Sequence, residues 1–352
     1  MRPLWRGMVA DRPLGAAQSH ASSLLVSGEA VLVAWFAGTH EGAADTRIHV
    51  ARGGLDGVFA TPVVVADAPV AHWNPVLASG PDGRVWLFFR RGSRIDTWTT
   101  WVCHSADAGR TWTQASELVP DDRSGGRGPV RQAPVAYADA WVAPGSVEVW
   151  SDPPVWDSFV DVCDDATAWR RVVLPLDHAR VRGAGSIQPA LVTGSQGQLV
   201  VLTRATGGAT LRSETSDPLH WPALVPCGLP NNNSGLAAVG LPDGRLAAVH
   251  NTATQDWGSR GHLAVSTSAD DGLSWRFRVS LEGEPANGKR SLDPGPDGSP
   301  VTAAVSGVVT SGEGEYSYPS ASVVGDELWV TYTWQRRGIA LARVPLDLLA
   351  GE

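Results

Sequence analysis

The sequence predicts an all-β chain: a six-bladed β-propeller of four-stranded antiparallel blades, formed as a single domain over residues 1–352. Three observations predict this fold. A short motif recurs every 52 to 57 residues, strand-like apolar runs recur in phase with it, and few stretches show the 3.6-residue period of a helix. Short strands joined by turns and repeated at this interval are typical of propellers.

The recurring motif reads Ser-x-Asp-x-Gly-x-Ser/Thr-Trp, and residues 105–112 and 268–275 are complete copies. Weaker copies end at Phe59, Trp169 and Trp221. In such a motif the Asp and Ser side chains bond backbone amides of a tight turn, the Gly adopts a positive φ, and the Trp packs between blades. We therefore interpret these aspartates as turn supports and not as catalysts.

The strand-like runs give each blade its inner strands. They lie at residues 31–36, 85–90, 199–204, 246–251 and 328–333, and several follow a Pro-Asp-Gly or Gln-Gly turn signal. We expect the last strands, at about residues 328–344, to join N-terminal strand material and close the ring. Closure removes the exposed sheet edges that otherwise invite aggregation.

Composition and charge exclude several classes of binding partner and cofactor. Hydrophobic residues make up 43% and charged residues 18% of the chain, which predicts a folded protein. A net charge of −8 without a basic block argues against nucleic acid and anionic membranes as partners. The three cysteines are widely spaced and form no Cys-x-x-Cys pair, so we expect no metal site and no cofactor.

Two further properties concern location and assembly. The longest apolar runs are far too short to span a bilayer, and the N-terminal residues contain no continuous apolar segment of the kind found in secretion signals. We therefore expect a cytoplasmic protein. The oligomeric state is left open.

Polar residues recur at one station of the repeat, found by counting back from each motif. This station holds His20, Asn74, Gln132, Gln188, Asn233 and the stretch 315–318. In a propeller the innermost strand of every blade lines the central axis, so these residues converge at one mouth of the channel. Because apolar residues would pack there equally well, the polar ring predicts a ligand site.

The two complete motifs match the Asp-box, or BNR repeat, of the sialidase superfamily, and the chain resembles the bacterial branch of predicted neuraminidases. The matching stretches are 20–24, 35–42, 73–75, 128–132, 188–189, 229–235 and 315–319. Together they run from about residue 18 to 345. The resemblance implies a sialidase-like propeller, and this branch resembles both glycosidases and polysaccharide lyases.

The resemblance also implies how a substrate carboxylate is bound. Sialidases use three arginines for this purpose, and the planar guanidinium suits the role because it pairs with a carboxylate bidentately. Arg204 and Arg260 stand where the second and third family arginines belong, whereas His20 occupies the region of the first. Arg131 and Arg90 are further cationic candidates.

The catalytic residues follow from the same resemblance. Tyr316 matches the tyrosine nucleophile of the family, and an unperturbed tyrosine titrates near 10 and needs a base. Gln188 occupies the place of the family's glutamate base and cannot accept a proton, which leaves Glu315, Glu313 or His20 as replacements. The family's acid/base aspartate is matched by Glu41, seven residues before Ile48.

The remaining candidates complete the predicted site. Asp45 lies on the same loop as Glu41 and is the second candidate acid. Asn74, Gln188 and Asn233 are candidate substrate-binding residues. Indole rings stack well on sugars, and the candidates for this role are Trp73, Trp98, Trp101 and Trp334.

Three functions remain open. The first is an exo-acting glycoside hydrolase on a small acidic sugar. The second is a lyase that cleaves next to a uronic acid by β-elimination, for which His20 and Tyr316 are residues of the right type. The third is a propeller that binds glycans without catalysis, which the fold alone permits.

Overall fold

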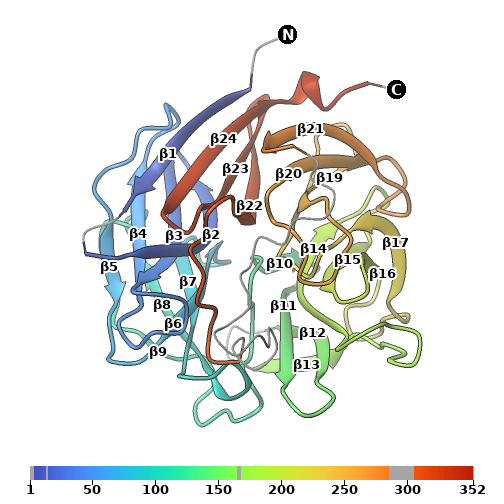
Figure 1. Ribbon diagram of the computed structural model, residues 1–352, viewed down its shortest axis with the longest axis horizontal. Coiled ribbons are helices and arrows are strands. Elements are labelled where there is room, and N and C mark those ends of the chain that lie inside the picture. The colour runs from blue at the N-terminus through green and yellow to red at the C-terminus, as the bar shows by residue number, and fades with distance from the viewer. Residues whose placement is uncertain (1–3, 13–14, 165–167, 285–304, 352) are drawn as a thin grey trace.

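Six antiparallel sheets are arranged around a central axis in the computed structural model, which describes residues 4–12, 15–164, 168–284 and 305–351 (Figure 1). Each sheet has four strands. The predicted six-bladed propeller is thus confirmed. Among the described residues the helices are two short 3₁₀ turns, Ile95–Thr97 and Leu346–Leu348, and none is long or apolar enough to cross a membrane.

Five blades are each built from four consecutive strands. Blade one contains β2 (Gln18–Ser27), β3 (Ala30–Gly38), β4 (Arg47–Gly53) and β5 (Val63–Ala66). Blade two contains β6 (His72–Ser79), β7 (Val85–Arg91), β8 (Thr99–Ser105) and β9 (Ser116–Glu117). Blade three contains β10 (Val135–Tyr137), β11 (Ala140–Val149), β12 (Val155–Cys163) and β13 (Trp169–Val173). Blade four contains β14 (Ser186–Thr193), β15 (Leu199–Ala205), β16 (Ala209–Thr215) and β17 (Val225–Pro230). Blade five contains β18 (Ala237–Gly240), β19 (Leu246–Asn251), β20 (Leu263–Ser268) and β21 (Arg276–Glu282).

Blade six joins the two ends of the chain. It contains β22 (Tyr316–Val324), β23 (Glu327–Trp334), β24 (Gly338–Pro345) and, as its outer strand, β1 (Trp5–Asp11). The antiparallel ladder runs from the pair Trp5 and Arg343 to the pair Asp11 and Gly338 (Figure 1). The ring is therefore closed in the way the sequence predicts, because N-terminal strand material pairs with the last strand.

The recurring motif has the structural role expected of it. The Asp107 carboxylate accepts hydrogen bonds from the Thr111 amide at 2.8 Å and the Thr111 hydroxyl at 2.6 Å, while Ser105 Oγ accepts one from the Gly109 amide at 2.8 Å. In the second copy, Asp270 accepts the corresponding bonds from Ser274 at 2.9 and 2.6 Å. These side chains hold the turns on the outer side of the blades.

The hydrophobic core lies between neighbouring blades. One cluster joins Leu32 and Phe36 of blade one to Leu87 and Phe89 of blade two, and the motif residue Trp112 packs against it. Burial of such apolar surface is the main favourable contribution to folding. Since every blade packs against two neighbours, the ring holds the inner strands around the axis in fixed positions.

Bulges interrupt the innermost strands at one repeated position. The ladders of β2, β6, β14 and β22 each shift register there, and the residues with positive φ are Ala21 (59°), Asn74 (42°), Gln188 (51°) and Tyr318 (51°). This conformation costs a non-glycine residue on the order of 1–3 kcal/mol and is concentrated at functional sites. The bulges also break the alternation of side chains between the two faces of a strand.

Candidate functional site

A small cavity lies at the axis and receives residues from all six blades. Its volume is about 30 Å³. Its lining consists of charged, amide and aromatic side chains with a few aliphatic ones: Glu41, Trp73, Asn74, Ile95, Trp98, Glu148, Trp150, Trp156, Gln188, Arg204, Trp257, Arg260, Val308, Tyr318 and Arg336. The structure thus brings together seven residues predicted as site residues, namely Glu41, Trp73, Asn74, Trp98, Gln188, Arg204 and Arg260.

Arg204 stands at the end of β15, where the ladder with β14 places it opposite Ile187 and next to Gln188. Its Nη1 donates to the Tyr318 hydroxyl at 2.6 Å and to Gln188 Oε1 at 3.1 Å, and its Nε donates to Asn233 Oδ1 at 2.8 Å. All three acceptors are uncharged. Asn233 does not line the cavity but orients this guanidinium from behind.

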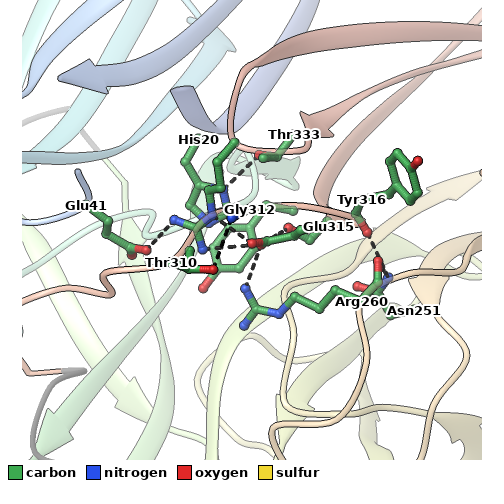
Figure 2. A network of polar contacts seen from close by, with 12 residues as sticks. His20, Glu41, Asn251, Arg260, Thr310, Gly312, Glu315, Tyr316 and Thr333 are labelled. Carbon is green, nitrogen blue, oxygen red and sulfur yellow. Dashed lines mark hydrogen bonds and ion pairs between the residues drawn. The ribbon is translucent and has the colours of Figure 1, made fainter. Parts of the chain in front are cut away.

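A buried ion-pair network occupies one side of the cavity (Figure 2). The fully buried Glu315 carboxylate accepts hydrogen bonds from Arg260 Nη1 at 3.0 Å and from Arg336 Nε at 2.9 Å. Arg336 Nη1 donates to Glu41 Oε2 at 2.6 Å. Burial acts to raise the pKa of Glu315, but the two arginines outweigh it and hold that pKa well below its usual range.

The charges of this network balance within it. Two guanidinium groups, those of Arg260 and Arg336, face the two carboxylates Glu41 and Glu315. Within the described part of the chain Arg204 forms no ion pair, and its hydrogen-bond acceptors are all neutral, although its charge also acts on the carboxyl groups of Glu148 and Asp256. A buried cation without a carboxylate partner favours an anionic ligand.

Tyr318, and not Tyr316, is the tyrosine of the cavity. The Tyr318 ring packs against three guanidinium groups, with distances from its centroid to Cζ of 5.4 Å for Arg131, 5.9 Å for Arg204 and 5.4 Å for Arg260. Tyr316 points away from the network in Figure 2 and packs in the core between blades five and six. Its hydroxyl accepts a hydrogen bond from Gln335 Nε2 at 3.3 Å.

His20, which the sequence predicts as a catalytic residue, lies outside the cavity. The ring is buried behind Tyr318, with the two ring centroids 4.3 Å apart, and it does not line the cavity. Its Nδ1 lies 2.9 Å from the Thr333 hydroxyl. Burial lowers the pKa of His20 well below 6.5, so the imidazole is neutral at physiological pH.

Three other predicted residues lie outside the cavity lining. Arg131 donates to the carbonyl oxygens of Ser22 at 2.8 Å and Pro319 at 2.7 Å, and so supports the bulge of β22. Arg90 donates to the carbonyl oxygen of Arg127 at 2.6 Å. Asp45 accepts from the Thr39 amide at 3.1 Å and holds a turn.

Several lining residues were missed by sequence reasoning. Arg336 comes from the turn between β23 and β24, where the motif count placed no station. Glu148 lies near the end of β11 and is the sole charged residue of that strand. Trp150, Trp156 and Trp257 complete an aromatic wall. Tyr318 did carry a signal, because it precedes a proline as Asn74 and Gln188 do at their stations.

Residues 305–310 pass beside the cavity. Val308 lines it, and the amide of Ile95 donates to the carbonyl oxygen of Val305 at 2.8 Å. Gly42 and Gly307 allow the backbone of this segment to contact the Glu41 loop. A Cβ atom on Gly307 would lie 1.9 Å from the Glu41 carbonyl oxygen, and one on Gly42 would lie 2.0 Å from that of Ser306.

Comparisons with known proteins place this geometry in a family. Residues 29–330 match the family described as BNR repeat-like domain, and the chain belongs to that family. A comparison with the curated proteins gives no match.

Solved structures share the fold at low identity. Trypanosoma rangeli sialidase is 12% identical with a TM-score of 0.68 over 99% of this chain and 61% of its own. The NanB sialidase from Streptococcus pneumoniae is 11% identical with a TM-score of 0.67 over 98% of this chain and 71% of its own. A Dyadobacter fermentans protein of unknown function is 12% identical with a TM-score of 0.70 over 97% and 99% of the two chains. The chain thus spans about three fifths of the trypanosomal sialidase, and at these identities the likeness shows the sialidase-like fold.

Proposed function

We propose that this protein is an exo-acting glycoside hydrolase whose substrate is a small sugar carrying a carboxylate. The observation that carries the proposal is the set of three guanidinium groups around one cavity, of which Arg204 forms no ion pair in the described part of the chain. A structure of the similar Trypanosoma rangeli sialidase contains sialic acid, which supports an acidic sugar as ligand.

The substrate carboxylate pairs with Arg204, and Arg260 and Arg336 flank it. The ion pairs of these two arginines with Glu315 and Glu41 fix their orientation before the ligand arrives, so little reorganisation accompanies binding. Indole rings of the cavity wall contact the apolar faces of the sugar.

Tyr318 is the nucleophile of this proposal. Its hydroxyl oxygen accepts a hydrogen bond from Arg204 at 2.6 Å, and a guanidinium in this position stabilises negative charge that develops on the phenol oxygen. The neighbouring Gln188 amide cannot take the phenol proton, so electrostatic stabilisation by Arg204 replaces a carboxylate base. The phenol gives its proton to water, and the phenolate oxygen then bonds to the anomeric carbon as the bond from that carbon to the leaving oxygen breaks. In a second step water hydrolyses the new bond and releases the phenolate.

Substitution of Arg204 tests the proposal. We expect Arg204→Met to raise KM for a carboxylate-bearing aryl glycoside by about 10²-fold, because truncating one partner of a buried charge pair costs on the order of 2–5 kcal/mol. The methyl ester of the same substrate lacks the charge, so the preference of the wild type for acid over ester collapses in the variant. Initial rates with aryl sialosides and aryl glucuronides provide the measurement.

A matched control separates binding from folding. Arg212 is a buried arginine of the same blade that pairs with Glu214 at 2.5 Å and does not line the cavity. Arg212→Met therefore leaves the ratio between acid and ester unchanged. An equal loss of acid preference in both variants contradicts the proposal. Appearance of an ultraviolet-absorbing C4–C5 double bond in the product indicates the lyase reaction instead, and tight binding without any product indicates a binding propeller.

A further inference from the structure

Glu148 lines the cavity together with Glu41, and its surroundings differ from those of Glu41 and of Glu315, which is not part of the lining. Glu41 and Glu315 form ion pairs with arginines, whereas Glu148 forms none among the described residues. Its neighbours are aromatic: Trp156 stands opposite it in the ladder between β11 and β12, and Trp150 follows it by two positions. The residue is 8% exposed.

The protonation of Glu148 follows from this environment. Burial raises the pKa of Glu148 to about 7, with Arg204 and the Trp150 indole acting to lower it and the charges of Glu41 and Asp96 acting to raise it. Near neutral pH a substantial fraction of Glu148 therefore carries a proton. Active sites often contain two carboxyl groups in different surroundings, so that one keeps its proton and acts as an acid while the other stays charged.

The ring places Glu148 across the axis from Tyr318. Glu148 belongs to blade three and Tyr318 to blade six, and these blades lie on opposite sides of the ring (Figure 1). Both side chains line the same cavity. A sugar held between them presents its anomeric carbon to the phenol oxygen and its leaving-group oxygen to the carboxyl.

We propose that Glu148 is the catalytic acid of this site, a role that rests on the proposed hydrolase function. As the Tyr318 oxygen bonds to the anomeric carbon, the bond from that carbon to the leaving oxygen breaks, and the leaving oxygen takes the proton of Glu148. In the second step the Glu148 carboxylate accepts a proton from water, the water oxygen bonds to the anomeric carbon, and the bond to Tyr318 breaks. The carboxyl is thereby protonated again.

This assignment gives Glu41 a different role from the one the sequence suggests. Its carboxylate lies 2.6 Å from Arg336 Nη1 and serves as an acceptor that positions this guanidinium. Glu148 is the lining carboxyl that holds a proton without first breaking an ion pair. The two glutamates are therefore matched residues for a comparison.

The experiment compares Glu148→Gln with Glu41→Gln on two substrates of one sugar acid. An alkyl glycoside has a poor leaving group and needs the acid, whereas a dinitrophenyl glycoside does not. We expect Glu148→Gln to lower kcat/KM, which reports the first step, by about 10²-fold or more on the alkyl glycoside and to leave kcat/KM on the dinitrophenyl glycoside within about 10-fold of wild type. We expect wild type to lose activity above about pH 7, where Glu148 gives up its proton, and this loss to disappear in the variant.

The possible outcomes distinguish failure of the role proposed for Glu148 from failure of the proposed hydrolase function. If the dependence on the leaving group follows Glu41→Gln instead, Glu41 is the acid and the inference is overturned while the hydrolase stands. If wild type hydrolyses neither substrate, the proposed function fails and the inference fails with it. Ligand binding measured by tryptophan fluorescence, together with the melting temperature, shows that both variants are folded. Added azide restores turnover to Glu148→Ala if the role is that of an acid/base, and absence of such rescue contradicts it.

Discussion

Tyr316 and Tyr318 lie two positions apart on β22, and in a regular strand both side chains would point to the same face. The bulge between Ser317 and Ser320 changes this, because Tyr318 adopts a φ of 51° and turns its ring toward the axis. Arg131 secures the bulge by donating to the carbonyl oxygen of Pro319 at 2.7 Å. Because of this one strained residue, the side chain of Tyr316 packs in the core while that of Tyr318 lines the cavity.

The tyrosine pair supports a direct test at the residue scale. We expect Tyr318→Phe to lower kcat by about 10²-fold or more, because it removes the hydroxyl that faces the anomeric carbon. Tyr316→Phe removes an equivalent hydroxyl that contacts only Gln335 in the described structure, so kcat stays within about 2-fold of wild type. Initial rates on an aryl glycoside check both. A larger loss in Tyr316→Phe than in Tyr318→Phe would return the nucleophile to Tyr316.

At the scale of elements, the sequence analysis located the turns and strands that belong to the repeat. The motif fixes the outer turn of a blade, so the phase of β14 and β15 follows from it. Gln188 was found by counting back from the motif, and Arg204 from the resemblance to the sialidase family. Arg336 and Glu148 were not found because they come from a turn and a strand end that the repeat does not mark. Sequence reasoning placed Tyr316 in the site, whereas Tyr318 lines the cavity, because strand periodicity does not reveal a bulge.

The segment 305–310 supports a prediction at this scale. A cavity of about 30 Å³ holds on the order of two waters and is smaller than a sugar, so we expect the segment to move when a ligand enters. In Gly307→Ala the new Cβ would lie 1.9 Å from the Glu41 carbonyl oxygen, which displaces the segment. We expect faster ligand association and stronger acrylamide quenching of tryptophan fluorescence in this variant.

Gly314 provides the matched control for this prediction. It also has a positive φ, of 69°, but a Cβ atom there meets no heavy atom within 4 Å. Gly314→Ala therefore imposes comparable backbone strain without displacing the segment. Equal quenching and equal association rates in the two variants would show that the segment does not limit entry to the cavity.

At the scale of the whole molecule, the cavity exists only when the ring is complete. Its lining comes from six blades, and blade six needs β1 as its outer strand. Val9 of β1 packs into a cluster with Leu24 and Trp329, which belong to blades one and six. The closing strand therefore stabilises both the sixth blade and its contact with the first.

Removal of the closing strand tests this dependence. We expect deletion of residues 1–11 to lower the melting temperature markedly and to promote aggregation, because it exposes the edge of β24. The milder Val9→Ala retains the strand and costs about 1–3 kcal/mol of the free energy of unfolding. Calorimetry and light scattering provide the measurement. An unchanged melting temperature after deletion would show that β1 contributes nothing to closure.

The pairing of β1 with β24 also has a consequence in time. During synthesis Trp5 leaves the ribosome long before its ladder partner Arg343. At about 5–20 residues per second, the delay between the two is on the order of 15–70 s. Through that interval the first strand has no native partner, although the strands of the first five blades can already pair. Pairing of β1 with β24, and with it closure of the ring, therefore waits until the residues of β24 have been synthesised.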